Sequence, residues 1–141
     1  MTQGRIVEIT EQGEPEVMQM KSFNFSDPEE GEVLINQKAL GMNFLDVYHR
    51  SGAYPLSMPS GIGTEAAGVI AKVGAGVKVF KEGDRVAYGG GAPGGYADCH
   101  QGGTYRGTDG EICGGTDNWG ATDVEVWYCL LYTSPSPRDR G

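Results

Sequence analysis

The sequence predicts a small domain that is mainly β, with short helices, over residues 1–100. Its 24 glycines and 7 prolines favour turns and short strands over long helices. Up to that point, runs that alternate between apolar and polar residues are separated by residues typical of turns. A chain of 141 residues can bury the core of one domain, but two complete domains would not fit.

Three strands are predicted in the first 41 residues. The stretches GRIVEITEQG (4–13) and EVMQMKSFNF (16–25) are two candidates, separated by the breakers Gly13 and Pro15. The third, EVLINQKALG (32–41), follows a loop and alternates in side-chain character, so at least one of its faces is expected to be covered.

A short helix is predicted for the stretch NFLDVYHRSG. Asn43 can cap its start and Gly52 can end it. Between them, Phe44, Leu45 and Tyr48 fall at helical spacing. The helix is therefore expected to be only about two turns long.

Two further strands are predicted from the stretch AAGVIAKVGAGVKVFKEGDRVAYG. The first runs through Val73 and ends at a glycine turn, Gly74 to Gly76. A second turn at Glu82 to Asp84 leads into a strand at Arg85 to Tyr88. No helical pattern follows the glycine turn, so we interpret it as a connection between strands and not as a phosphate-binding loop.

The net charge and the N-terminal sequence limit the kinds of partner that the protein is expected to bind. A formal charge of -8 opposes the attraction that supplies most of the affinity for a phosphate backbone. No apolar run reaches membrane-spanning length, and MTQGRIVEIT has neither the basic nor the apolar region of a secretion signal. We expect a cytoplasmic protein with no nucleic-acid partner and no membrane partner.

Cysteine and histidine spacing gives no metal motif. Cys99, Cys113 and Cys129 are widely separated and form no C-x-x-C pair. His49 and His100 are the only histidines. We expect three ordinary thiols and two histidines that serve as surface or packing residues.

The pattern changes after His100. Residues 101–128 contain few large aliphatic side chains amid many glycines, so they can bury little surface. We expect this segment to be a disordered or frame-shifted tail. The stretch CLLYTSPSPRD (129–139) resembles the translation of a transposon-end adapter used in sequencing libraries, so residues 129–141 are expected to be adapter-derived.

Four blocks in the first hundred residues carry a family resemblance. They are GEPEVMQ (13–19), KALGMNFLDVYHRSGAYP (38–55), PSGIGTEAAGVIAKVGAGV (59–77) and GDRVAYGGGAPGGYADCH (83–100). Their order and spacing resemble the N-terminal part of quinone oxidoreductases, the zeta-crystallin-like, zinc-free branch of the medium-chain dehydrogenase/reductase superfamily. The resemblance implies a GroES-like, partly open β-barrel as the catalytic domain. It also implies a Rossmann domain for NADPH, which we expect to be missing from these 141 residues.

The resemblance also implies that this chain holds no zinc. The zinc-dependent alcohol dehydrogenases of the superfamily have G-x-C-x-x-D where this chain has Gly41 to Asp46, and G-H-E where it has Gly63-Thr64-Glu65. The two zinc-ligand positions are thus Asn43 and Thr64. An amide and a hydroxyl are poor substitutes for a thiolate and an imidazole, so no metal is expected.

Three residues are the candidate site by this resemblance. Asn43 and Tyr48 are expected to contact the nicotinamide and to donate hydrogen bonds to the substrate carbonyl as negative charge develops on it. Tyr54 is expected to line the nicotinamide or substrate pocket. From the residues alone, a plain helix cap, a core aromatic and an aromatic before a proline turn remain the alternatives for Asn43, Tyr48 and Tyr54. Asp46 is expected to organise the helix.

Glu65 is a carboxylate among small apolar residues, so it is expected either to be paired or to have a shifted pKa, and pairing with backbone donors or an arginine is the favoured alternative.

The function implied by the resemblance is that of an NADPH-dependent quinone oxidoreductase, homodimeric when intact. It would pass reducing equivalents from NADPH to a quinone or a related unsaturated carbonyl. The chain itself is expected to be inactive, because the main contacts to NADPH would come from the second domain. Two alternatives stay open: a non-enzymatic GroES-like binding or structural module, and a zinc-free reductase of enoyl thioesters or alkenals.

Overall fold

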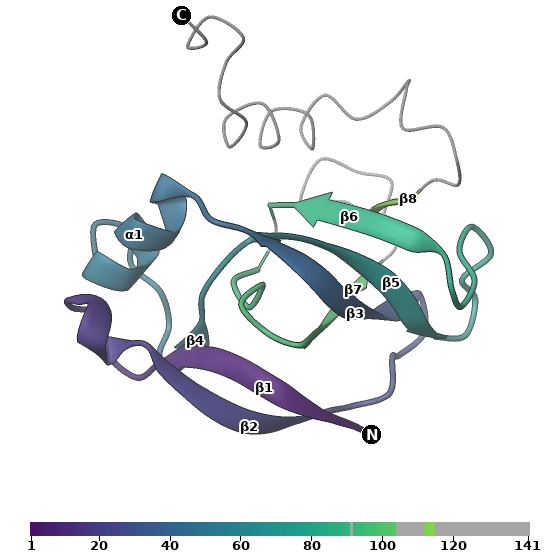
Figure 1. The fold of residues 1–141 in the computed structure, drawn as a ribbon, viewed down its shortest axis with the longest axis horizontal. Helices are drawn as coiled ribbons and strands as arrows, with labels where there is room; N and C mark the ends of the chain where they lie inside the picture. The colour runs from purple at the N-terminus through teal and green to yellow at the C-terminus, as the bar shows by residue number, and fades with distance from the viewer. Residues whose placement is uncertain (91, 104–111, 115–141) are drawn as a thin grey trace, which may run out of the picture.

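The computed structural model describes residues 1–90, 92–103 and 112–114. Its strands form a three-stranded sheet in the order β2-β1-β4 and a five-stranded sheet in the order β7-β3-β5-β6-β8 (Figure 1). The strands are β1 (Thr2–Ile9), β2 (Gln19–Phe25), β3 (Glu32–Gly41), β4 (Ser60–Gly61), β5 (Glu65–Val73), β6 (Arg85–Gly89), β7 (Cys99–Gly103) and β8 (Ile112–Gly114). The helices are the 3-10 helix η1 (Pro15–Val17) and α1 (Phe44–Ser51).

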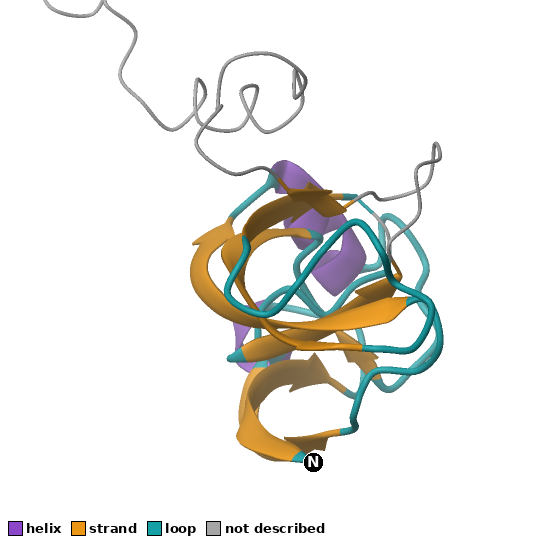
Figure 2. Ribbon diagram, turned by 90° about the vertical axis from the view of Figure 1, so that its right-hand side faces the viewer, coloured by secondary structure: helices purple, strands orange, loops and turns teal. Residues whose placement is uncertain are grey.

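The two sheets are joined along the segment that precedes β7. Val7 donates a backbone hydrogen bond to Tyr96 (2.8 Å), Asp98 donates one to Arg5 (2.9 Å), and Ile6 and Ala97 form an isolated bridge. The strands are strongly curved, as the view in Figure 2 shows. The mainly β fold with short helices that the sequence predicts is confirmed, and the described strands do not close into a complete barrel.

Strand β3 lies at the centre of the core. Val33, Leu34 and Ile35 are fully buried, because β3 is covered on both faces. One face packs in a cluster that includes Ile70 and Tyr88, and the other packs with Phe25, Ala97 and Cys99. The predicted strand over 32–41 is therefore confirmed, and both of its faces are covered.

The predicted ends of the first two strands are wrong. Strand β1 stops at Ile9, four residues short of Gly13, and β2 begins at Gln19. Pro15 starts η1, because its fixed φ suits a helical turn and it has no N–H for a strand ladder. The N–H of Gly13 is directed elsewhere, to the carbonyl of Arg50 (2.8 Å).

The predicted helix is confirmed. Its N-cap is Asn43, and Gly52 adopts the left-handed conformation (φ 92°) that ends it. The Gly52 N–H donates to the carbonyl of Tyr48 (3.2 Å). In Figure 1, α1 lies just beyond the end of β3, an internal strand of the five-stranded sheet.

The segments predicted to lie beyond the domain are described only in part. Residues 101–103 belong to β7, and Ile112–Gly114 pair with β6 as β8. Residues 104–111 and 115–141 lie outside the described residues, so the frame-shifted and adapter-derived segments stay predictions. Within the described ranges, no helix is long and apolar enough to cross a membrane.

Candidate active site

The site begins where β3 ends and α1 starts. Gly41, the last residue of β3, pairs with Glu65, the first residue of β5. Asn43 follows in an extended conformation (φ -127°, ψ 154°) and caps α1. The antiparallel pairing therefore brings the start of the helix next to the Glu65 carboxylate.

Asn43 is held at both its backbone and its side chain. Its N–H donates to Oδ2 of Asp46 (2.8 Å), and its Nδ2 donates to Oε2 of Glu65 (2.9 Å). The position of Asn43 as the cap residue agrees with the sequence, and its side-chain amide also bonds to the Glu65 carboxylate. The amide group is thereby fixed across the gap between β5 and α1.

The pairing expected for Glu65 differs from the observed one. Among the residues that the structure describes, the hydrogen-bond partner of Glu65 is the amide of Asn43. The reason is local: Gly41 has no side chain, so the Glu65 side chain lies against the Gly41 backbone and reaches Asn43. A Cβ on Gly41 would be only 2.5 Å from Cδ of Glu65.

Asp46 organises the first turn of the helix, as the sequence predicts. Its carboxylate is buried, and Oδ2 accepts hydrogen bonds from the Asn43 N–H and from the Tyr96 hydroxyl (2.8 Å each). Burial raises the pKa of Tyr96, and the hydrogen bond to Asp46 and its negative charge raise that pKa further. The Tyr96 hydroxyl therefore stays protonated and remains a donor to Asp46.

Tyr48 and Tyr54 are brought together on the open side of α1. Their ring centroids are 5.3 Å apart, and the side chains are 43% and 53% exposed. The chain turns back at Gly52, so the Tyr54 N–H donates to the Tyr48 carbonyl (3.1 Å). Tyr48 is thus not a core aromatic. No hydrogen bond joins Asn43 to Tyr48 in the part of the chain that the structure describes.

Gln12 holds this arrangement, and sequence reasoning missed it. Its Nε2 donates to the carbonyls of His49 and Tyr54 (3.1 Å each). The neighbouring Gly13 exchanges hydrogen bonds with Arg50, backbone to backbone and from the guanidinium to the Gly13 carbonyl. The partners lie 37 to 42 positions away along the chain, so no local pattern could have indicated them.

The structure also describes Thr64, the second position at which the zinc-dependent enzymes carry a zinc ligand. Thr64 is buried, and its carbonyl accepts a hydrogen bond from Gly90 (2.9 Å). Within the described residues, no group of three or more His, Cys, Asp or Glu side chains could hold a metal ion.

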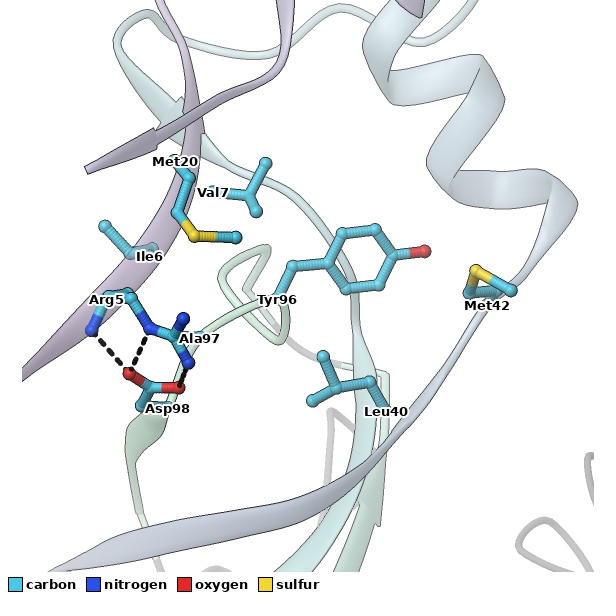
Figure 3. Close-up of a pocket in the computed structure, with 9 residues that line it drawn as sticks. All are labelled: Arg5, Ile6, Val7, Met20, Leu40, Met42, Tyr96, Ala97 and Asp98. Carbon is cyan, nitrogen blue, oxygen red and sulfur yellow. Dashed lines mark hydrogen bonds and ion pairs between the residues drawn. The ribbon is translucent and has the colours of Figure 1, made fainter. Parts of the chain in front are cut away.

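A pocket of about 350 Å³ opens beside the site (Figure 3). Its walls are mostly apolar, formed by Ile6, Val7, Met20, Leu40, Met42 and Ala97 together with the ring of Tyr96. At one side, the Arg5 guanidinium donates two hydrogen bonds to the carboxylate of Asp98 (3.0 and 3.1 Å). Tyr96 therefore connects this pocket to the Asp46 carboxylate.

The fold and this site place the chain in a known class. It belongs to the family of alcohol dehydrogenase GroES-like domains, whose model matches residues 29–128.

Quinone oxidoreductases are among its relatives within that class. The chain is 52% identical over 95 residues to quinone oxidoreductase 1 of Escherichia coli, covering 67% of this chain and 29% of the relative. A crystal structure of an Escherichia coli quinone oxidoreductase complexed with NADPH superposes with a TM-score of 0.67 and 50% identity, over 69% of this chain and 30% of that one. The quinone oxidoreductase of Pseudomonas syringae pv. Tomato DC3000 superposes with a TM-score of 0.74 and 38% identity, over 82% and 34%. The chain thus spans about three-tenths of the length of these proteins.

Proposed function

We propose that this chain contributes the catalytic domain of an NADPH-dependent quinone oxidoreductase. The enzyme would pass reducing equivalents from NADPH to a quinone or a related unsaturated carbonyl. The observation that carries the proposal is the half-exposed pair of Tyr48, on the helix that Asn43 caps, and Tyr54, just beyond the end of that helix, in a chain with quinone oxidoreductases among its relatives.

Asn43 and Tyr48 are the proposed donors to the substrate. A carbonyl that accepts hydride or electrons develops negative charge on its oxygen, and donors held in place stabilise that charge. One N–H of the Asn43 amide is used by Glu65, which leaves the second for a substrate. The Tyr48 hydroxyl bonds to no described protein group, so it is free to donate.

Tyr48 and Tyr54 fit a planar, partly apolar ring such as a nicotinamide. Their rings are adjacent, tilted by 58° and open to solvent, so they offer aromatic surface with hydroxyls at its edge. When bound, NADPH supplies the hydride. These residues contact only that end of the cofactor in our proposal, and the main phosphate and adenosine contacts belong to a second domain.

We further propose that the reaction proceeds without zinc. Asn43 and Thr64 replace the thiolate and imidazole of the zinc enzymes, and the Asn43 amide nitrogen is already bonded to Glu65. The intact protein is proposed to be a cytoplasmic homodimer with no nucleic-acid or membrane partner.

A hybrid enzyme tests the proposal. In it, residues 1–100 of this chain replace the corresponding segment of the Escherichia coli relative. The hybrid is expected to oxidise NADPH with a quinone, whereas the 141-residue chain alone is not. Asn43→Ala and Tyr48→Phe should each lower the hybrid's kcat about 100- to 1,000-fold, the scale of losing one donor to a developing oxyanion. Asn24→Ala, an exposed asparagine on β2, is the matched control.

Three results would contradict the proposal. Unchanged quinone turnover in both variants would show that Asn43 and Tyr48 are not the donors. Turnover of enoyl thioesters or alkenals without quinone turnover would assign another reductase activity. A ring-shaped oligomer of the 141-residue chain, seen by light scattering, would favour a co-chaperone.

A further inference from the structure

Within the described residues, Glu65 is joined to the proposed site by a hydrogen bond to Asn43. Its Oε2 accepts the Asn43 Nδ2–H at 2.9 Å, and Gly41 provides the space in which its side chain lies. The three residues come from three different segments: the end of β3, the cap of α1 and the start of β5. A carboxylate has thus been placed beside the amide by strand pairing and not by local sequence.

The hydrogen bond to Glu65 sets the orientation of the Asn43 side-chain amide. An ionised carboxylate only accepts hydrogen bonds, so the nitrogen of the Asn43 amide, and not its carbonyl oxygen, must face Glu65. The backbone of Asn43 is fixed separately by Asp46, which in turn is held by Tyr96. With its backbone and its side chain both bonded, Asn43 has little freedom to present its second N–H in another direction.

We propose that Glu65 is a positioning residue for Asn43. It holds the amide in the one orientation that directs the second Nδ2–H to the substrate carbonyl, without touching the substrate itself. The inference rests on the proposed role of Asn43 as a donor. A charge-assisted hydrogen bond suits this task, since it is shorter and stronger than a neutral one and so restricts the amide more tightly.

Gly41 allows the proposal to be tested without altering either partner. A methyl group at this position would meet Cδ and Oε1 of Glu65 at 2.5 and 2.6 Å. Those atoms end a flexible side chain, so Glu65 can move aside and the protein can still fold. Gly41→Ala is therefore expected to separate Glu65 from Asn43.

The activity test is a double-mutant cycle in the hybrid enzyme. Glu65→Ala should lower kcat about 10-fold and leave the KM for NADPH within about twofold, because the amide is misdirected but cofactor binding is not. In the Asn43→Ala background the same change should cause no further loss. Glu65→Gln should recover part of the activity, because its side-chain carbonyl can accept the hydrogen bond from Asn43. Gly41→Ala should lower kcat as Glu65→Ala does. Glu16→Ala, at an exposed glutamate, is the control.

A second measurement does not depend on activity. In the 141-residue chain, the side-chain amide signals of Asn43 in a ¹⁵N NMR spectrum should shift in Glu65→Ala and in Gly41→Ala, but not in Glu16→Ala. Unshifted signals would overturn the contact. Full kcat in a folded Glu65→Ala hybrid, or a loss that adds to that of Asn43→Ala, would overturn the positioning role and leave the proposed function standing. Full kcat in Asn43→Ala would overturn the proposed role of Asn43 and this inference with it.

Discussion

The Tyr88 hydroxyl donates a hydrogen bond of 2.8 Å to the side-chain carbonyl of Gln37 inside the core. Both residues are buried, at 3% and 8% exposure. The Gln37 amide nitrogen donates in turn to the carbonyls of Gly95 (3.0 Å) and Ala97 (2.9 Å). The single glutamine thus uses both amide N–H groups and its carbonyl, linking β6 and β3 to the segment before β7.

Removing the Tyr88 hydroxyl should destabilise the domain. Tyr88→Phe leaves the Gln37 carbonyl buried and unpaired, which costs about 1–3 kcal/mol of the free energy of unfolding. Urea denaturation of the 141-residue chain measures this loss. Tyr48→Phe is the matched control, since that hydroxyl is exposed and its removal should change stability by less than about 0.5 kcal/mol. Equal losses in the two variants would contradict the role of the Gln37 network.

Gly63 and Gly83 form a second matched pair. Both have positive φ (87° and 90°), so alanine is strained at either position. At Gly63, however, the new Cβ would lie 2.4 Å from the ring of Tyr96, whereas nothing lies within 4 Å at Gly83. Gly63→Ala should lower the free energy of unfolding by about 1–3 kcal/mol more than Gly83→Ala, because it adds overpacking to the same backbone strain. A smaller loss at Gly63 than at Gly83 would show that the ring moves away freely.

His100 should make stability depend on pH above the range of the carboxylates. It stacks on Tyr88 with ring centroids 4.5 Å apart, and burial lowers its pKa below the ordinary 6.5, against a weaker opposite effect of its hydrogen bond with the Gly94 backbone. The folded state therefore favours neutral His100. Its contribution to stability is complete above the unfolded pKa of 6.5 and is lost as pH falls below it.

Denaturation at a series of pH values measures this effect. The decline between about pH 7 and pH 5 should disappear in His100→Phe, which keeps an aromatic ring on Tyr88. The lowered pKa values of Asp27, Glu32 and Asp98 act in a separate range. Protonation of these three carboxylates begins to reduce the free energy of unfolding only as pH falls to their unfolded pKa values of 3.8 to 4.5, because the groups are charged in the folded state. A slope unchanged in His100→Phe would contradict the assignment.

Gln12 should hold the end of α1 and the tyrosine pair in place. Gln12→Ala removes both hydrogen bonds from its amide to the helix end and to Tyr54. Hydrogen exchange at the Gly52 and Tyr54 amides should become about tenfold faster, which corresponds to a local loss of about 1.4 kcal/mol. Gln3→Ala, an exposed glutamine on β1, should leave both rates unchanged. Equal exchange rates in the two variants would show that the hydrogen bonds of Gln12 are not needed to hold the end of the helix.

Much of the local structure could be predicted because its signals are local. Strand β3 contains the β-branched and apolar run Val33 to Ile35 between turn residues, and α1 carries a cap at Asn43 and a glycine stop at Gly52, so each element follows from about ten adjacent residues. The end of β1 could not be predicted in this way, because the N–H of Gly13 is used by Arg50, a residue 37 positions away.

Some features of the candidate site likewise depend on neighbouring residues in the sequence, and others depend on tertiary contacts. The residue types at positions 43 and 64, the short helix and the role of Asp46 were accessible from the sequence, because motif spacing and helix caps depend on neighbours. Tertiary structure set three other features: the exposure of Tyr48, the hydrogen bonds donated by Gln12, and the hydrogen bond from Asn43 to Glu65. The partners in the last contact are 22 positions apart, and only the pairing of β3 with β5, with a glycine opposite the carboxylate, brings them within hydrogen-bond distance.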